Sequence, residues 1–390
     1  MKYPVDTLVL VPDNVDIARS PLAGQLGEET YILGAFNPGM TRLPNGNLLL
    51  MVRIAEALRT PIRDGHVRSI RWTDEDGPRR FVLDAWPVDQ ADTADPRKFT
   101  LRSGGWKVMA LTSLSWLLPV ELTPDGTQRV AIHYDKAIVP AYSFQCYGIE
   151  DPRISHIDGR YMMTTCSVSP ERHSTTLYIS DDGLDWRFAD IILDHQNKDM
   201  LLFEGLIEGQ YWAQTRPLGD LYFAYPPGSE WRAGPSINLA SSPDGLHWKP
   251  HRQPGIRTRA DTVATARIGA GTPPILTDRG WLSLWHAVEP KEIVGIYRTY
   301  WSIMDRDDPS QVVATQETAI LEPSIELTRP IEHQMYLHDV VFSTGIAEHG
   351  DYYIVASGEA DLACRMTHIP KGAFGISSSL GRPVSDDGVG

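Results

Sequence analysis

Cysteine is scarce in this chain, and long apolar runs are missing. The 390 residues include only three cysteines, Cys146, Cys166 and Cys364, and none stands in a CxxC or other metal-binding spacing. Three cysteines are too few for a disulfide framework, so we expect reduced thiols that pack as small hydrophobic side chains. No stretch approaches the roughly 20 apolar residues that span a bilayer, and the first residues do not resemble a secretory signal. A cytoplasmic protein is the simplest expectation.

Positive charge is also in short supply. Lys and Arg number 36 against 50 Asp and Glu, which gives a net charge of −14 at pH 7. Nucleic acids and anionic membrane surfaces both require a basic face on the protein that binds them. We therefore expect neither a nucleic-acid partner nor a membrane partner.

Helical periodicity is weak throughout, and a different pattern takes its place. The 29 prolines and 32 glycines recur every few residues and interrupt any long helix. One unit returns along the chain: a polar turn that ends in glycine, followed by a short aromatic or β-branched run. Each glycine can adopt the positive φ that a tight hairpin demands. The turn glycines are Gly46, Gly159, Gly209, Gly280 and Gly350.

A second repeat supports a chain built of hairpins. Residues 180–186 and 242–248 share the form S-x-D-G-L-x-W, in which a tryptophan follows an Asp-Gly turn. A pair of unrelated hairpins is the alternative, because Asp-Gly is the commonest short hairpin signal. Two seven-residue matches favour a true repeat.

Five all-β repeats of this length predict a closed ring of sheets, a five-bladed β-propeller. A sandwich of two sheets with an added domain is the alternative. We expect one catalytic domain over residues 1–375, with a charged insertion at about 68–105 that either covers the funnel or bridges subunits. A Ser- and Gly-rich tail over residues 376–390 is expected to be flexible. A propeller would gather loops from every blade at one end and bring distant residues to one ligand.

The segment G-I-E-D-P-R-I at 148–154 is the strongest candidate for chemistry. It places two carboxylates, Glu150 and Asp151, beside the guanidinium of Arg153. Neighbouring like charges raise one carboxyl pKa and a nearby cation lowers one, so such a cluster can hold one acid protonated and another ionised. Cleavage of a sugar linkage requires that combination. A surface turn with a salt bridge is the alternative.

Polar residues also recur where the strands of the other repeats meet their loops. For any single residue a solvated turn is the alternative, but the recurrence predicts one shared polar funnel. The histidines in these clusters lack close paired spacing, so we predict no metal site. The candidate substrate contacts are Asn37, Arg53, Asp199, His286, Asp339 and Asp361.

These residues resemble glycoside hydrolase family 130, which holds the β-mannoside phosphorylases and related β-mannosidases and has a five-bladed propeller fold. The matching segments run from residue 37 to about residue 361 and cover nearly the whole chain. Their order and spacing are specific to the family more than to a subgroup. The segments are Asn37-Pro38, residues 148–154, Asn197-Lys198-Asp199 with Leu202-Phe203, Arg216-Pro217, G-x-G-x-P-P-I at 269–275 and V-V-F-x-T-G at 340–345.

The resemblance implies an inverting enzyme that cleaves β-mannosidic linkages in short mannose-containing oligosaccharides. Asp151 would be the general acid for the glycosidic oxygen, directly or through a sugar hydroxyl, and Glu150 and Arg153 would hold sugar hydroxyls. In a phosphorylase, Lys198 and Arg216 would bind the attacking phosphate, because a dianion requires cations and Arg offers a bidentate fork. The enzyme would release α-mannose 1-phosphate, with inorganic phosphate as co-substrate and no other cofactor.

Two departures from the family pattern favour hydrolysis instead. Gln214-Thr215 stands before Arg216-Pro217 where the family commonly shows His-x-Arg-Pro, so a phosphate donor is missing. Phe203-Glu204-Gly205-Leu206 replaces Phe-Pro-Glu-Lys, and an extra carboxylate about 4 Å from phosphate would cost on the order of 4 kcal/mol at an effective dielectric of about 20.

Glu204 is therefore the candidate base of an inverting hydrolase, in which the two carboxyls stand roughly 6.5–9.5 Å apart. A salt-bridged loop residue near Lys198 is the alternative. Phosphorolysis is favoured, and hydrolysis and a propeller that only binds sugars stay open. The linkage position, the reducing-end sugar and the formation of a homo-oligomer are open as well.

Overall fold

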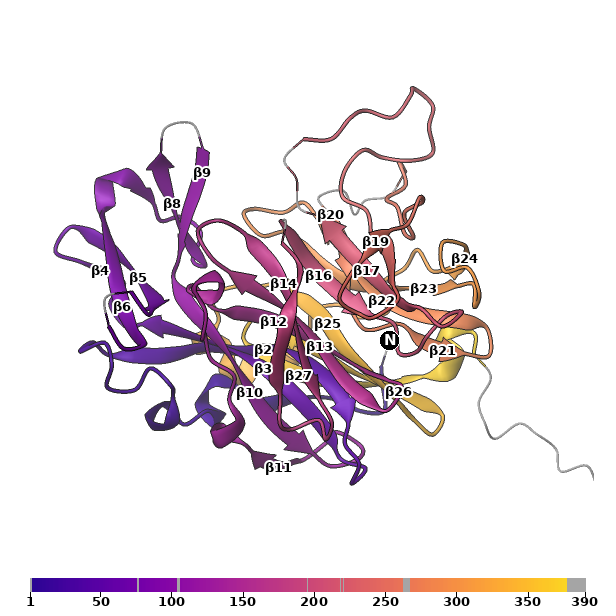
Figure 1. Ribbon diagram of the computed structural model, residues 1–390, viewed down its shortest axis with the longest axis horizontal. Coiled ribbons are helices and arrows are strands. Elements are labelled where there is room, and N and C mark those ends of the chain that lie inside the picture. Colours follow the sequence, from indigo (N-terminus) through magenta and orange to yellow (C-terminus); the bar gives the residue numbers. More distant parts are fainter. Residues whose placement is uncertain are drawn as a thin grey trace, which may run out of the picture.

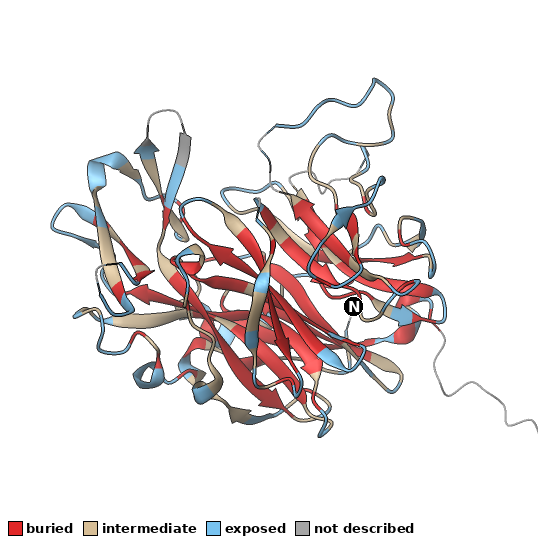
Figure 2. Cartoon of the chain, viewed as in Figure 1, coloured by how far each residue is buried: buried red, intermediate tan, exposed pale blue. Residues whose placement is uncertain are grey.

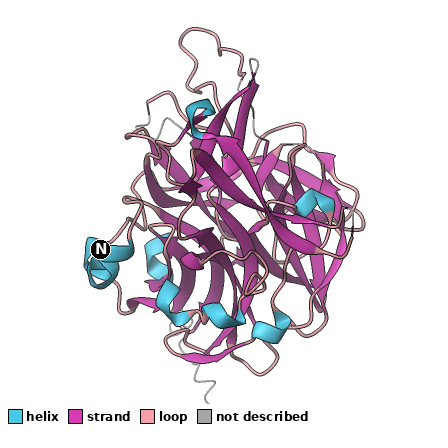
Figure 3. Cartoon of the chain, turned by 90° about the vertical axis from the view of Figure 1, so that its left-hand side faces the viewer, coloured by secondary structure: helices cyan, strands magenta, loops and turns pink. Residues whose placement is uncertain are grey.

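Strands account for almost all regular structure in the computed structural model, which describes residues 2–75, 77–103, 106–194, 196–217, 219, 221–261 and 267–376 (Figures 1 and 3). The all-β prediction is confirmed. The predicted tail beyond residue 376 lies outside the described residues. Over the described ranges no helix is long and apolar enough to cross a membrane. The helices are α1 (Ile325–Thr328) and short 3₁₀ segments at Pro12–Asn14, Ile17–Arg19, Val88–Gln90, Tyr134–Lys136, Ser143–Gln145, Arg329–Gln334 and Lys371–Phe374.

Five antiparallel sheets of four or five strands form most of the molecule. The first contains β2 (Thr30–Arg42), β3 (Leu48–Leu58), β10 (Ser113–Leu122) and β11 (Arg129–Ile132). The second contains β12 (Ile149–Ile157), β13 (Arg160–Val168), β14 (His173–Ser180) and β15 (Arg187–Leu193). The third contains β16 (Asn197–Leu202), β17 (Tyr211–Pro217), β18 (Asn238–Ser242) and β19 (Lys249–Pro250).

The two remaining large sheets follow the same chain order. The fourth contains β20 (Arg267–Ala270), β21 (Ile275–Thr277), β22 (Gly280–Glu289), β23 (Ile296–Met304) and β24 (Val312–Thr315). The fifth contains β25 (Val341–His349), β26 (Tyr352–Glu359) and β27 (Ala363–Pro370), and the N-terminal strand β1 (Asp6–Leu10) pairs with β27 at its edge. The fifth sheet is therefore made from both ends of the chain.

The predicted turn glycines stand at the first hairpin of each large sheet. Four lie between β2 and β3, β12 and β13, β16 and β17, and β25 and β26, and in the fourth sheet Gly280 is the first residue of β22, directly after the turn from β21. The φ angles are 88° at Gly46, 75° at Gly159, 73° at Gly209, 125° at Gly280 and 56° at Gly350. The prediction that these turns require glycine is confirmed.

The S-x-D-G-L-x-W repeat forms the hairpin between the third and fourth strands of two successive sheets. One copy joins β14 to β15, and the other joins β18 to β19. Asp182 Oδ1 accepts the backbone N–H two residues on at 2.8 Å, and Trp186 Nε1 donates to the carbonyl of the turn glycine at 2.9 Å. Asp244 and Trp248 make the same bonds at 2.9 and 3.1 Å. The two segments are equivalent turns, as predicted.

Two three-stranded sheets stand between β3 and β10, where the charged insertion was expected. One contains β4 (Ile62–Arg63), β5 (His66–Thr73) and β6 (Arg80–Pro87), and the other contains β7 (Ala91–Asp92), β8 (Lys98–Ser103) and β9 (Trp106–Leu111). Figure 1 shows them together on one side of the molecule. They span residues 62–111, more than the 68–105 expected, because the segment forms hairpins of its own.

Hydrophobic side chains fill the spaces between successive sheets, and the middle strands are mostly buried (Figure 2). In β3, Leu50 clusters with Ile354 of β26. Its immediate neighbours Leu49 and Met51, on the other face, cluster with Ile154 of β12. Successive side chains of a strand point to opposite faces, so β3 is buried on both sides. Further clusters join the second sheet to the third, the third to the fourth, and the fourth to the fifth.

Arg365 attaches the N-terminal strand to the fifth sheet. Its buried guanidinium donates to both carboxylate oxygens of Asp6 in β1, at 2.7 and 2.8 Å, and to Glu359 of β26 at 2.9 Å. A bidentate pair of this kind combines charge with fixed geometry. The pair therefore holds the first residues of the chain against the last strands.

Replacing Asp6 with Ala will lower the free energy of unfolding by roughly 1–3 kcal/mol, because a buried guanidinium loses one of its two carboxylate partners. Chemical denaturation of the full chain measures the change. Asp13→Ala removes an exposed carboxylate from the same terminal segment and serves as the control. An equal loss in both variants would contradict the role given to the pair.

Candidate active site

One cavity of about 320 Å³ collects side chains from all five large sheets and from the insertion. Residues that are distant in the sequence meet there because the first strands of successive sheets lie next to one another: β12 packs against β2 and β16, and β16 packs against β20. The residues expected from the sequence that line it are Asn37, Arg53, Glu150, Asp151, Lys198, Asp199, Arg216, His286 and Asp361.

A β-bulge in the first strand of three sheets presents a polar residue to this cavity. The pairing register shifts within β2, β12 and β16. At each shift one residue has a left-handed backbone: Asn37 with φ 47°, Asp151 with φ 50° and Asp199 with φ 60°. Asn and Asp tolerate this region better than other non-glycine residues, and a bulge re-aims the side chain. The residue type at these positions is therefore set by the backbone as well as by chemistry.

Arg53 of β3 bridges the two neighbouring carboxylates of β12. Its Nη1 donates to Asp151 Oδ1 and its Nη2 to Glu150 Oε1, both at 2.9 Å. Asn37 Nδ2 donates to the same oxygen of Asp151 at 2.9 Å, and Lys198 Nζ donates to Glu150 Oε2 at 2.8 Å. Both carboxyls are largely buried, with side-chain exposures of 11% for Asp151 and 4% for Glu150. Each is thus compensated by cations from neighbouring strands.

These contacts determine the charge of both groups. Burial by itself raises the pKa of Asp151, but the charges of Arg53, and then of Lys198, outweigh burial and hold that pKa well below its usual range. The pKa of Glu150 is lowered for the same reasons. The pKa of Asp361 is raised by burial, with a contribution from the nearby charge of Asp151. Without a ligand, Asp151 is an ionised carboxylate.

Asp199 is the centre of a second cluster. Its Oδ1 lies 3.2 Å from Arg153 Nη2, and its Oδ2 lies 2.8 Å from Arg216 Nη2 and 3.8 Å from His286 Nε2. Burial raises the pKa of Asp199, but the charge of Arg216 outweighs it, and the net shift is downward. This carboxylate therefore fixes three side chains around one wall of the cavity.

His286 stays neutral in this cluster. Burial lowers its pKa to about 3 in spite of the attraction of Asp199, and the charge of Arg216 also lowers it. A neutral imidazole can donate one hydrogen bond and accept another. Gly269 makes room for the ring, because a Cβ there would lie 2.5 Å from His286 Cε1 and 2.6 Å from Asp199 Oδ2.

Arg267 differs from the other cations of the cavity. Its guanidinium carbon lies 5.3 Å from the ring centroid of Tyr297, and within the described residues no ion pair joins it to a carboxylate. The other arginines and Lys198 are paired. The pairs are Arg53 with Glu150 and Asp151, Lys198 with Glu150, Arg216 with Asp199, and Arg97 with Asp95.

Three residues expected at the site do not line the cavity: Arg153, Asp339 and Glu204. Arg153 lies beneath it, with 1% of its side chain exposed, and donates to the backbone carbonyls of Asp151 at 2.7 Å and Gly271 at 3.1 Å. Asp339 has a left-handed backbone and accepts from Lys291 Nζ at 2.6 Å near the surface. Neither side chain is in direct reach of the cavity, so both hold the surrounding structure.

Glu204 lies far from Asp151, which corrects the expectation that the two carboxyls stand together. Glu204 Oε1 accepts from the backbone N–H of His156 at 3.3 Å. His156 is near the end of β12, five residues beyond Asp151, and a strand rises by about 3.3 Å per residue, so the separation is on the order of 15 Å. Lys198 pairs with Glu150 and not with Glu204. Burial raises the pKa of Glu204 to about 7.

Several cavity residues carry no motif that sequence reasoning could find. Arg97 and Lys98 come from the insertion, and Asp95 holds the Arg97 guanidinium through two bonds of 3.0 and 2.9 Å. Arg267 stands two residues before the G-x-G-x-P-P-I segment. Its position beside that glycine-rich turn is the one sequence feature that could have marked it as a site residue. Within the described ranges no group of three or more His, Cys, Asp or Glu side chains is placed to hold a metal ion. The missed residues are Arg97, Lys98, His173, Arg267, Tyr297 and Tyr336.

Replacing Arg53 with Ala will raise the pKa of Glu150 and Asp151 and lower the free energy of unfolding at pH 7 by roughly 3–5 kcal/mol, because buried carboxylates lose their main compensating charge. A folded-state pKa above the unfolded value makes stability increase as the pH falls. The difference in the free energy of unfolding between the variant and the wild type will therefore shrink as the pH falls from 7 to 5, as measured by denaturation. Arg59→Ala, which removes an exposed partner of Glu29, is the control. A pH-independent difference would contradict the assignment.

Comparison with known proteins identifies the family of this chain. The model of glycoside hydrolase family 130, described as beta-1,4-mannooligosaccharide phosphorylase, matches residues 114–372. A β-1,2-mannobiose phosphorylase of Listeria innocua is 28% identical over 338 residues, which cover 85% of this chain and 87% of the relative. A 1,2-β-oligomannan phosphorylase of Thermoanaerobacter is 33% identical over 217 residues, which cover 55% of this chain and 65% of the relative.

The solved structures agree with the sequence comparison. The structure of a β-1,2-mannobiose phosphorylase from Listeria innocua, in complex with β-1,2-mannobiose, has a TM-score of 0.77 at 26% identity and covers 94% of this chain and 95% of its own. The family match spans well over half of the chain. This chain belongs to glycoside hydrolase family 130.

Proposed function

We propose that this protein is an inverting phosphorylase that cleaves β-mannosidic linkages in short oligosaccharides and releases α-mannose 1-phosphate. The observation that carries the proposal is the charge of the cavity. Six cationic side chains line it against four carboxylates, Glu150, Asp151, Asp199 and Asp361, although the whole chain has a net charge of −14. A local excess of positive charge suits a dianion such as phosphate. The matched relatives are themselves named as β-mannoside phosphorylases.

The phosphate site is proposed around Arg267, with Lys198 and Arg216. Among the described residues Arg267 has no carboxylate to leave before it can bind an anion, and its guanidinium lies beside the ring of Tyr297. This arrangement does not require the histidine that the family pattern has and this chain lacks. Gln214, which stands at that position, accepts from Ser283 at 3.1 Å and does not line the cavity. A different cation would then supply the lost contact.

Asp151 is proposed as the general acid. A phosphate oxygen attacks the anomeric carbon on the side opposite the leaving sugar, the bond from that carbon to the glycosidic oxygen breaks, and the oxygen takes the proton of Asp151, directly or through a sugar hydroxyl. The attacking hydrogen phosphate releases its own proton to solvent, and Asp151 takes up a proton from solvent for each turnover, so that no net proton is consumed. A dianion bound beside Lys198 adds negative charge near Asp151 and so raises its pKa. Phosphate binding would thereby prepare the acid for donation.

Hydrolysis is not favoured, because the candidate base Glu204 lies at the other end of β12. A water-activating carboxylate must stand within about 6.5–9.5 Å of the acid.

Arg97 and Lys98 support a role of the insertion in substrate contact, since both line the cavity. We therefore propose that the insertion closes one side of the cavity, which is one of the two roles considered from the sequence.

The five large sheets are proposed as the blades of a five-bladed propeller within one catalytic domain, with β4–β9 as its insertion. Support comes from the packing of β25 against β2 and β23, which brings the last large sheet next to the first and the fourth. A cytoplasmic location and the formation of a homo-oligomer stay predictions from the sequence.

Cleavage of β-mannobiose will depend on phosphate. The wild type will release mannose 1-phosphate in phosphate buffer and little free sugar without phosphate, as measured by chromatography of the products. Asp151→Asn will lower kcat by about 10²–10⁴-fold, because it removes the proton donor. Equal cleavage with and without phosphate would eliminate the phosphorylase. Sugar binding without any turnover by the wild type would favour a propeller that only binds sugars.

Arg267→Ala will raise the KM for phosphate by about 10–100-fold with a smaller effect on the KM for the sugar, because a hydrogen bond to a charged group contributes roughly 1.5–3 kcal/mol. Arg267→Lys will restore part of the loss, since it keeps the charge but not the fork. Arg298→Ala, in the same sheet but paired with Glu289 and Glu322 at the surface, is the matched control. An unchanged KM for phosphate in Arg267→Ala would exclude the proposed anion site.

A further inference from the structure

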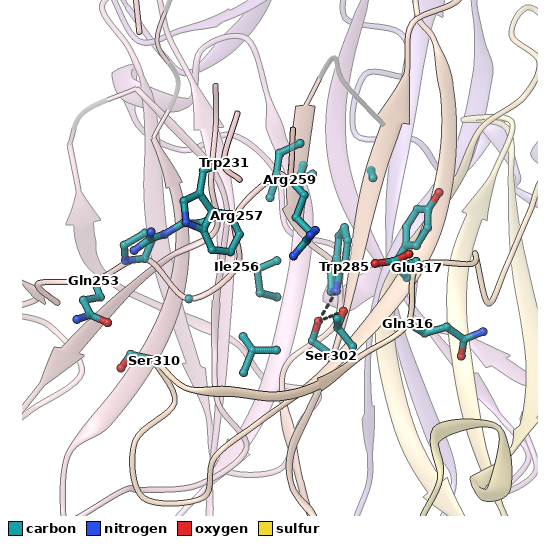
Figure 4. Close-up of a pocket in the computed structure, with 18 of the residues that line it drawn as sticks. Trp231, Gln253, Ile256, Arg257, Arg259, Trp285, Ser302, Ser310, Gln316 and Glu317 are labelled. Carbon is teal, nitrogen blue, oxygen red and sulfur yellow. Dashed lines mark hydrogen bonds between the residues drawn. The ribbon is translucent and has the colours of Figure 1, made fainter. Parts of the chain in front are cut away.

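A second cavity, of about 550 Å³, lies between the third and fourth large sheets (Figure 4). Among the described residues it shares no lining side chain with the catalytic cavity. The two cavities occupy opposite faces of the same strands: Trp285 lines the second and His286 the first, and in β20 Ile268 lines the second and Arg267 the first. Consecutive side chains of a strand point to opposite faces, so this separation follows from the pleat. The proposed reaction makes no use of the second cavity.

One wall of the second cavity is an aromatic platform. Trp285 of β22 and Tyr300 of β23 are directly opposite each other, and their rings stack at a centroid distance of 5.0 Å and an angle of 21°. Trp285 Nε1 donates to Ser302 Oγ at 2.9 Å, which fixes the indole ring. Both rings are partly exposed. A flat apolar surface is therefore in place before any ligand binds, which lowers the entropy cost of binding.

The opposite wall comes from loops of the third sheet. Residues 230–232 run beside residues 258–260, with backbone bonds from Arg232 N–H to Thr258 at 2.9 Å and from Ala260 N–H to Glu230 at 2.8 Å. Trp231 stands in this paired segment, and the Arg257 guanidinium lies 5.2 Å from its ring centroid. Figure 4 shows Trp231 and Trp285 on different sides of the cavity, with Arg259 drawn between them. Two indole side chains thus line one cavity.

The charged side chains of this cavity balance, in contrast to those of the catalytic cavity. Arg257 and Arg259 line it together with Asp261 and Glu317. Arg259 is already paired, at 3.3 Å from Asp261 and 3.6 Å from Glu230. A nucleotide would bring phosphates that require additional cations. Aromatic faces combined with planar, charge-balanced hydrogen-bonding groups suit a neutral ligand that has apolar ring faces and many hydroxyls.

We propose that the second cavity binds a neutral pyranoside chain, with sugar faces against Trp285 and Trp231 and hydroxyls on Arg259, Gln253 and Glu317. That the bound oligosaccharide is a β-mannoside rests on the proposed function. Because the two cavities lie on opposite faces of β20 and β22, an oligomannoside in the second would occupy a site separate from the first.

The test is a titration of the full chain carrying Asp151→Asn, without phosphate, with β-1,2-linked and β-1,4-linked mannotetraose, followed by isothermal calorimetry. Two binding events per chain are expected with at least one of the two sugars. Trp231→Ala and Trp285→Ala, each added to Asp151→Asn, will weaken the second event by about tenfold or more. Trp231 belongs to a surface loop, so its removal keeps the test valid where loss of Trp285 affects folding.

Turnover separates this inference from the proposed function. In the otherwise wild-type chain, Trp231→Ala will leave phosphorolysis of mannobiose unchanged, and Trp186→Ala, which removes an indole from a turn of the second sheet, will leave both binding events unchanged. A single binding event, or a second one that ignores both tryptophans, overturns the inference even where phosphorolysis is found. Two events in a protein without phosphorolysis would overturn only the proposed function. Binding of ADP in place of the sugars would overturn the ligand class.

Discussion

The bond of Arg53 to both Glu150 and Asp151 is the contact on which the rest of the catalytic cavity depends. Carboxylates that leave water need opposite charges and hydrogen bonds, and a partly compensated pair would be strongly destabilising. Arg53 comes from β3, its partners from β12, and Lys198 from β16. The compensation of charge therefore also joins three neighbouring sheets, and the same contacts serve stability and chemistry.

This dependence is compatible with the proposed anion site in a strongly acidic chain. Most cations of the cavity are engaged by carboxylates, which keeps them in place without a ligand and holds the pKa of Asp151 low. Arg267 is the exception, because it faces the cavity beside Tyr297 with no carboxylate partner among the described residues. An anion that binds there changes the potential felt by Asp151. Binding and protonation are then two parts of one electrostatic balance.

Sequence reasoning succeeded where backbone conformation restricts the type of a residue. It failed where the position of a residue along a strand determines its distance from the cavity. Turn glycines such as Gly46 could be found because the positive φ of a tight turn restricts the residue type. Asn37 and Asp151 were named from polar clusters and from the family resemblance, and the β-bulges that hold them were not predicted. Glu204 was expected beside Lys198 because the family pattern places its segment at the phosphate pocket. The chain between them runs along β16 and away from the cavity, so a few residues of strand separate the two groups by many ångströms.

The amino-acid sequence by itself determined the all-β class, the positions of the hairpins, the equivalence of the S-x-D-G-L-x-W turns and the resemblance to glycoside hydrolase family 130. The strand class and the turns depend on steric preferences that act over a few neighbouring residues, and the resemblance depends on the order and spacing of short segments along the whole chain. Only the tertiary structure decided which side chains line one cavity and that the insertion contributes Arg97 and Lys98. It also decided which cation has no carboxylate partner within the part of the chain that is described. Electrostatic pairing acts through space between residues from different sheets, and no local pattern in the sequence records it.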